Sequence, residues 1–153
     1  MLLLPDQIRW AILAHAENCA PNECCGLVAI DDLGRLRFAY PLSNADPSPI
    51  SYTIDPDEHF RAMRHAESMG WEIGGVFHSH PGGTAMPSMI DVQMALEPDW
   101  LYLVAAPGEI RGFHIRSGVI EELALDRRSD PDRDDHGHDD VGDDGVEPVE
   151  QPV

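Results

Sequence analysis

The chain has 153 residues and contains no lysine: its ten basic residues are all arginine. Against these stand 28 acidic residues, and the formal net charge is −18. Because a phosphate backbone or an anionic membrane surface would repel such a protein, we expect neither nucleic acid nor a membrane among its partners. A GC-rich genome that favours arginine explains the missing lysine, so we attach no function to its absence.

Long apolar runs are also missing. No run approaches the roughly 18 apolar residues of a membrane-spanning helix, and the first residues lack the basic region and apolar stretch of a signal peptide. Cysteine is scarce as well, with Cys19, Cys24 and Cys25 forming an odd, closely spaced set unlike a secreted disulfide framework. We therefore expect a cytoplasmic protein in which Cys25 packs at the start of a strand. Cys24 is a candidate for a reactive thiol.

Acidic residues gather at the C-terminal end. From Asp126 onward, 11 acidic and three basic residues contribute −8 to the formal charge, and apolar residues almost vanish. We predict one domain over residues 1–125, followed by an acidic, disordered tail over residues 126–153. His136 and His138 in this tail are weak candidates for metal binding, and a solvated tail is the default interpretation.

Helical and strand patterns alternate along the predicted domain. Helices are predicted over residues 5–18, 56–69 and 88–96, and strands over 25–30, 36–41, 50–54, 71–77, 101–106, 110–116 and 119–125. Asp55 is expected to cap the second helix, with Glu58 completing a capping box. Because strands outnumber helices and helices fall between them, we predict an α/β (α+β) fold with a mixed sheet flanked by helices.

The most informative residues follow the strand predicted over 71–77. Successive side chains of a strand alternate between its faces, so His78 and His80 should project the same way and Ser79 the opposite way. A proline and two glycines then force a loop, after which Ser88 starts a helix with Asp91 one turn later. Two imidazoles and one carboxylate are ligands that Zn²⁺ accepts, and they leave a fourth tetrahedral position open.

Each part of this pattern has a simpler interpretation. A His-x-His pair alone is a weak signal, and Ser-x-x-Asp caps a helix without any metal. The histidines at positions 15, 59, 65 and 114 lie in predicted helices or strands, where surface or packing roles are expected.

The combined spacing resembles that of the JAMM (MPN-plus) metallopeptidases, which carry an upstream Glu, then His-Ser/Thr-His, seven residues, Ser, two residues and Asp. Here residues 81–87 separate His80 from Ser88, and Asp91 follows in register. Residues 21–26 read Pro-Asn-Glu-Cys-Cys-Gly, similar to the Pro-x-Glu-x-Cys-Gly segment that carries the family's glutamate. The resemblance covers roughly residues 5–125 and implies the MPN (JAB1) fold, which is similar to that of cytidine deaminases.

The resemblance also implies a role for each residue. His78, His80 and Asp91 would hold one Zn²⁺, which lowers the pKa of water from about 15.7 to roughly 7. Glu23 would act as the general base, and Ser88 would donate a hydrogen bond to the oxyanion. Without the motif, Glu23 would be interpreted as an ordinary exposed loop carboxylate.

JAMM enzymes cut amide bonds after the C-terminal glycine of ubiquitin-like proteins. The short connection between Ser79 and Ser88 leaves little room for inserted loops, so the chain looks closest to the compact prokaryotic branch, which includes peptidases that release cysteine from CysO-type sulfur carriers. The resemblance thus implies a zinc (iso)peptidase acting on a small ubiquitin-like or sulfur-carrier protein that ends in Gly-Gly. MPN domains often pair, which leaves a homodimer open.

Three alternatives remain at this point. One is a deubiquitinase-like isopeptidase that removes a modifier from protein lysines. Another is a non-catalytic MPN scaffold, although such proteins usually lack some of the ligands that are all present here. A third is a cupin-type β-barrel, which also uses His-x-His but needs further His and Glu ligands downstream, where Glu109 and His114 are a poor imitation.

Overall fold

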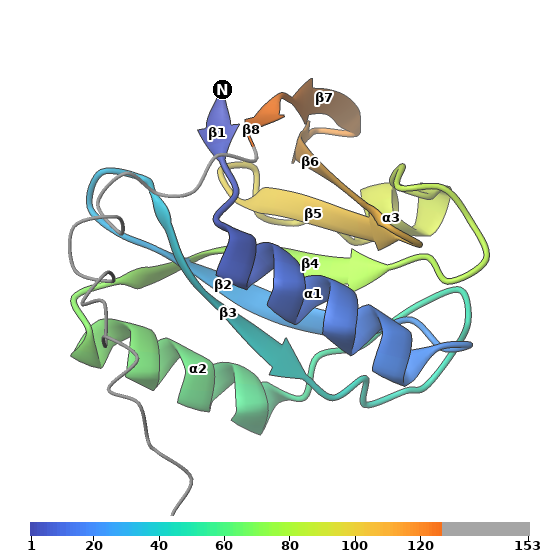
Figure 1. Ribbon diagram of the computed structural model, residues 1–153, viewed down its shortest axis with the longest axis horizontal. Helices are drawn as coiled ribbons and strands as arrows, with labels where there is room; N and C mark the ends of the chain where they lie inside the picture. The colour runs from blue at the N-terminus through green and yellow to red at the C-terminus, as the bar shows by residue number, and fades with distance from the viewer. Residues whose placement is uncertain (127–153) are drawn as a thin grey trace, which may run out of the picture.

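The computed structural model describes residues 1–126, and Figure 1 shows their arrangement. In chain order the elements are β1 (Leu2–Leu3), α1 (Asp6–Cys19), β2 (Cys25–Ile30), β3 (Leu36–Leu42), α2 (Pro56–Ser68), β4 (Glu72–Ser79), α3 (Met89–Met94), β5 (Leu101–Ala106), β6 (Glu109–Arg116), β7 (Val119–Leu123) and β8 (Leu125–Asp126). The predictions made for residues 127–153 lie outside the described part of the chain.

Six strands form one mixed sheet in the order β3-β2-β4-β5-β6-β7. The β4–β5 pair is parallel and the other four pairs are antiparallel. Helix α3 lies in the connection between the two parallel strands, which cannot be joined by a tight turn. The predicted mixed sheet flanked by helices is confirmed.

The alternating strand residues divide the core into two layers. Ile8 and Ile12 of α1 pack in one cluster with Phe77 of β4, and α1 crosses that face of the sheet in Figure 1. Ala62 and Ala66 of α2 pack in the other cluster, on the opposite face. Since helices cover both faces of an open sheet, the cupin-type barrel is excluded.

The strand predicted over residues 50–54 is wrong. The structure has only an isolated bridge between Asn44 and Ile54 in this segment. The side chain of Asn44 bonds the main chain there, with Nδ2 donating to Ser51 O at 3.1 Å and Oδ1 accepting from Thr53 N at 3.0 Å. A side chain thus satisfies main-chain groups that a neighbouring strand would otherwise bond.

Two smaller expectations also differ from the structure. Asp55 caps α2 as predicted, but Glu58 does not complete a capping box, because its carboxylate accepts from the N–H and the hydroxyl of Ser43 at 3.0 Å each. The strand predicted over 119–125 is divided into β7 and β8, and β8 pairs in parallel with β1, a strand that the sequence did not predict.

Within the described residues, no helix combines the length and apolarity needed to cross a membrane.

Candidate metal centre

The two histidines lie at the end of strand β4, with His78 inside the strand and His80 one residue beyond it. His78 is 1% exposed and pairs with Cys25 of the neighbouring antiparallel strand β2. The N–H of His80 donates to Ala105 O at 2.7 Å, which extends the bonding of β4 to β5 by one residue. As the two-residue period predicts, both imidazoles turn the same way, and their Nε2 atoms are 3.1 Å apart.

The tautomer of His80 follows from the hydrogen bond of its Nδ1 atom. Nδ1 lies 2.9 Å from Thr84 O, and because a carbonyl oxygen only accepts, Nδ1 must carry the hydrogen of this bond. In the neutral ring the lone pair is then on Nε2, which faces His78 and Asp91. A carbonyl partner of this kind commonly fixes a metal-binding histidine.

Asp91 belongs to a reciprocal capping box at the start of α3. Ser88 Oγ accepts the Asp91 N–H at 3.1 Å, and Asp91 Oδ2 accepts the Ser88 N–H at 2.7 Å. The same oxygen is 2.9 Å from His78 Nε2 and 3.0 Å from His80 Nε2. Burial alone would raise the pKa of Asp91, but the Ser88 N–H and the two histidines, when these are protonated, outweigh it and hold the pKa well below its usual range.

Glu23 comes from the loop between α1 and β2, yet its side chain is only 2% exposed. Its position follows from the strand register: Cys25 lies opposite His78, so in an antiparallel pair Glu23 comes beside His80. Glu23 Oε2 is 3.9 Å from His80 Nε2. The interpretation as an exposed loop carboxylate is therefore wrong.

The surroundings of Glu23 favour its protonated form. Burial raises the pKa of this carboxyl from its usual 4.5 to about 7, with His80 acting in the opposite direction and Asp91 adding to the rise. Oε1 is buried and has no hydrogen-bond partner among the described residues. A buried carboxylate oxygen without a partner indicates that the structure has a place for a further polar group or ion.

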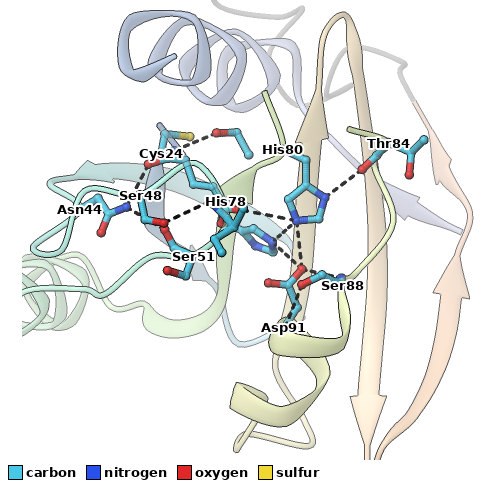
Figure 2. A network of polar contacts seen from close by, with 12 residues as sticks. Cys24, Asn44, Ser48, Ser51, His78, His80, Thr84, Ser88 and Asp91 are labelled. Atoms are coloured by element: carbon cyan, nitrogen blue, oxygen red, sulfur yellow. Dashed lines mark hydrogen bonds and ion pairs between the residues drawn. The ribbon is translucent and has the colours of Figure 1, made fainter. Parts of the chain in front are cut away.

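The four side chains together form the one group of possible metal ligands within residues 1–126. One ligand atom from each of Glu23, His78, His80 and Asp91 lies within 4.8 Å of all the others. Figure 2 shows His78, His80, Asp91 and Ser88 turned toward one another.

The donor set fits a zinc-type cation. Ligand atoms at about 2.0–2.2 Å from tetrahedral zinc lie about 3.3–3.6 Å apart, a few tenths of an ångström more than the three separations between His78, His80 and Asp91. The lone pair of His80 Nε2 also faces a carboxylate oxygen, which is repulsive unless a proton or a cation lies between them. Two imidazole nitrogens and one carboxylate oxygen would fill three positions of a tetrahedral ion and leave the fourth coordination position free. Glu23 lies beside this set.

A cleft of about 900 Å³ opens onto these groups. Glu23, His80 and Ser88 lie in its wall, together with the largely apolar residues Pro21, Pro49, Ile50 and Ile90. An extended peptide segment entering this cleft would reach Glu23, His80 and Ser88 together.

Asn44 and Tyr52 lie in a segment that resembles the CysO-peptidase branch, but the sequence did not assign them a role in supporting the site. The ring of Tyr52 stacks on His78, with a centroid distance of 4.8 Å and an interplanar angle of 25°. Asn44 donates to Glu23 O at 3.2 Å. Neither residue has a sequence spacing to the motif that would predict its contact. Ser79 was expected on the opposite strand face, and there its hydroxyl accepts the Cys24 N–H at 2.8 Å.

The remaining described histidines make packing contacts, as expected. His15 Nε2 bonds the carbonyls of Cys25 and Leu42, His65 Nδ1 lies 2.7 Å from Tyr40 Oη, His114 Nδ1 lies 3.1 Å from Trp100 O, and His59 faces the Trp100 ring.

The structure contradicts the expectation of a reactive Cys24. Its side chain is fully buried, and burial raises the pKa of the thiol to about 11, so the nucleophilic thiolate is disfavoured. Cys25 is buried at the start of β2, as predicted.

The chain is similar to known proteins. Residues 5–116 match the family model described as prokaryotic homologs of the JAB domain. The chain is 36% identical over 131 residues to the desampylase of Haloferax volcanii, covering 81% of this chain and 94% of that protein. It is 32% identical over 118 residues to the CysO-cysteine peptidase of Mycobacterium tuberculosis, covering 73% and 81%. A probable TtuB-protein conjugate cleaving protease of Thermus thermophilus is 32% identical over 130 residues, covering 82% of each chain.

Solved structures agree with the fold. The solution structure of a Desulfitobacterium hafniense protein superposes with a TM-score of 0.76 at 32% identity, covering 85% of this chain and 94% of that one. A JAB1/MPN domain protein from Archaeoglobus fulgidus has a TM-score of 0.55 at 17% identity, covering 82% and 97%, and this likeness concerns the fold alone. The matched family, the relatives and the fold agree, and the chain belongs to the prokaryotic JAB-domain family, the compact prokaryotic branch of the JAMM (MPN-plus) proteins.

Proposed function

We propose that the protein is a zinc-dependent peptidase that hydrolyses the amide bond after the C-terminal glycine of a small ubiquitin-like or sulfur-carrier protein. One observation carries the proposal. A buried glutamate with a raised pKa lies 3.9 Å from one of two convergent histidines, at the wall of an open cleft.

His78, His80 and Asp91 are the residues that would hold the ion. When bound, a zinc ion supplies a Lewis acid that polarises the substrate carbonyl and increases the acidity of the attacking water. Asp91 is suited to remain charged because its pKa is held low, and its cap fixes the direction of the carboxylate. The carbonyl of Thr84 holds the ring of His80 with Nε2 toward the site.

Glu23 is the proposed general base. It takes a proton from the attacking water and delivers it to the nitrogen of the leaving amine. A base is most effective when its pKa lies near the working pH, and burial moves the pKa of Glu23 toward 7. An ion nearby would favour the ionised form, so the carboxylate would be ready to accept a proton.

Ser88 is the proposed donor to the oxyanion. Its oxygen accepts the N–H of Asp91 through a lone pair, which leaves the hydroxyl proton available to donate. Ser88 lies in the wall of the same cleft as Glu23. A donor aimed at the position where negative charge develops lowers the barrier to amide hydrolysis.

The substrate class is inferred from the cleft and from the relatives. Gly82 and Gly83 line the cleft together with prolines and two isoleucines, and a carrier tail ending in Gly-Gly would bring no side chains of its own into this space. The relatives are named desampylase, CysO-cysteine peptidase and probable TtuB-protein conjugate cleaving protease. The leaving amine is accordingly either cysteine or a protein lysine. Pairing of two copies and a cytoplasmic location stay predictions.

The non-catalytic scaffold is the competing function. A scaffold has no need for a buried glutamate beside the histidines, and every position of the motif is occupied here. We therefore favour the enzyme.

The test uses purified protein with its metal content measured by mass spectrometry. A carrier ending in Gly-Gly is supplied either with a C-terminal cysteine or joined to a protein lysine. The Glu23→Gln variant should retain zinc and lose about 100- to 10,000-fold in cleavage rate. Glu67→Gln, at an exposed glutamate of α2, is the matched control and should cleave like wild type.

Two results would overturn parts of the proposal. If Glu23→Gln retains zinc and cleaves at the wild-type rate, Glu23 is not the base. If zinc-loaded wild-type protein cleaves neither substrate, the scaffold replaces the enzyme.

A further inference from the structure

The main chain of Glu23 is held by residues of the loop between β3 and α2. The Glu23 N–H donates to Ser48 O at 2.8 Å, and Asn44 Nδ2 donates to Glu23 O at 3.2 Å. Figure 2 shows Asn44, Ser48 and Ser51 gathered on one side of His78, away from Asp91. The loop thus forms hydrogen bonds with both the N–H and the carbonyl oxygen of Glu23, the residue proposed as the base.

The side chain of Asn44 is fully bonded. Nδ2 donates to Glu23 O and to Ser51 O, and Oδ1 accepts from Asp46 N at 3.1 Å and from Thr53 N at 3.0 Å. An asparagine amide has two hydrogens to donate and commonly accepts two bonds, and here all four are used. This pattern also fixes the amide orientation, since the nitrogen must face the two carbonyls.

The carboxylate of Glu23 depends on this support. Oε1 has no hydrogen-bond partner among the described residues, and the contact of Oε2 with His80 at 3.9 Å is too long for a hydrogen bond. The position of the carboxylate is therefore set by the backbone of Glu23. A shift of about 1 Å in a reacting group can cost on the order of 100-fold in rate.

The same loop reaches the site at two further points. Tyr52, one residue after Ser51, stacks on His78. Ile50, one residue before Ser51, lines the cleft. By bonding both Glu23 O and Ser51 O, the single amide of Asn44 ties the base to the loop that carries these two residues.

We propose that Asn44 is a positioning residue for the cleavage reaction, holding Glu23 in place through its main-chain carbonyl. This inference rests on the proposed function, since it requires Glu23 to be the base. Asn44 lines neither the cleft nor the group of possible ligands, so it acts through Glu23 and does not itself take part in the chemistry.

Two variants test the role. Asn44→Asp is nearly the same size but replaces both donors with an oxygen that faces the Glu23 and Ser51 carbonyls, and Asn44→Ala removes all four bonds without adding charge. Each should retain zinc and lower kcat by about 10- to 100-fold, with KM changing much less. Ala45→Asp is the matched control, because it adds the same charge at an exposed neighbouring position and should retain wild-type kcat.

A double-mutant cycle separates positioning from general damage. If Asn44 acts through Glu23, Asn44→Ala should cause no further loss in the Glu23→Gln background, because the base it positions is already absent. Losses that multiply would overturn the inference, as would wild-type kcat in both Asn44 variants. Should Asn44→Asp fail to fold, the cycle with Asn44→Ala decides.

The two proposals can fail separately. Full activity of Glu23→Gln overturns the proposed base and the inference with it. An inactive Glu23→Gln together with fully active Asn44 variants overturns the inference alone.

Discussion

Ser88 and Asp91 bond each other twice: the Asp91 carboxylate accepts the Ser88 N–H at 2.7 Å, and the Ser88 hydroxyl accepts the Asp91 N–H at 3.1 Å. This capping box starts α3 and also orients the carboxylate toward the two histidines. Local helix formation and the geometry of the site therefore depend on the same pair of side chains. Changes at Ser88 have to be assessed for stability and for activity separately.

Replacing Ser88 should separate these two roles. Ser88→Ala removes the cap and should lower the free energy of unfolding by about 1 kcal/mol, whereas Ser88→Gly should lower it by only a few tenths of that. Both variants lose the proposed oxyanion donor, so both should lose about 100- to 1,000-fold in kcat. Denaturant unfolding and steady-state kinetics measure the two effects. Wild-type kcat in Ser88→Gly would remove Ser88 from the mechanism.

Tyr52 should contribute to metal affinity through His78. His78 Nδ1 is buried without a hydrogen-bond partner among the described residues, so the ring is oriented by the contact of Nε2 with Asp91 and by its stacking on Tyr52. Supporting contacts of this kind typically change metal affinity by about 10- to 100-fold, and we expect the lower end for Tyr52→Ala. Tyr52→Phe retains the ring and should bind zinc like wild type. Competition with a chelator measures both affinities, and equal values for the two variants would contradict the prediction.

Gly26 is required by the close packing beside the site. A Cβ at this position would overlap the ring of Phe77 and the carbonyl oxygen of Tyr40, and a backbone oxygen cannot rotate away. Gly26→Ala should therefore lower the free energy of unfolding by about 1–3 kcal/mol or more.

Gly82 offers the matched control for this substitution. Its added Cβ would meet no atom within 4 Å, and Gly82→Ala should change stability by less than about 0.5 kcal/mol. Denaturant melts of both variants are the measurement. If Gly26→Ala is as stable as Gly82→Ala, the packing around β2 is looser than the structure indicates.

Burial of Glu23 should make the stability of chelator-treated protein depend on pH. The pKa of Glu23 is raised from its usual 4.5 to about 7 in the folded chain, so the folded state retains a proton that the unfolded state releases. Stability is then highest below pH 4.5, falls as pH rises from 4.5 to 7, and is constant above 7 as far as this group is concerned.

Glu23→Gln has no carboxyl group to titrate, so comparing this variant with wild type isolates the contribution of Glu23. In metal-free protein, the difference in free energy of unfolding between Glu23→Gln and wild type should shift in favour of the variant between pH 4.5 and 7. A difference that does not change with pH would show that the folded and unfolded carboxyls have equal pKa values.

Much of the fold could be predicted because it depends on short-range patterns. The two-residue period of a strand placed His78 and His80 on one side, and strand β2 was predicted with its observed bounds. A helix cap involves residues three positions apart, so the pair of Ser88 and Asp91 was also predictable. The segment 50–54 was wrongly predicted as a strand because the side chain of Asn44, in the preceding part of the same loop, bonds its backbone.

The sequence by itself determined which side chains could hold an ion and how three of them converge, since His78, His80 and Asp91 lie within 14 residues of one another. Only the tertiary structure decided that Glu23 comes beside His80 and that Asn44 holds Glu23. These contacts depend on the pairing of β2 with β4, in which Cys25 lies opposite His78, and on a loop folded over that pair. Strand order and register arise from the packing of the whole core, which no local spacing in the sequence specifies.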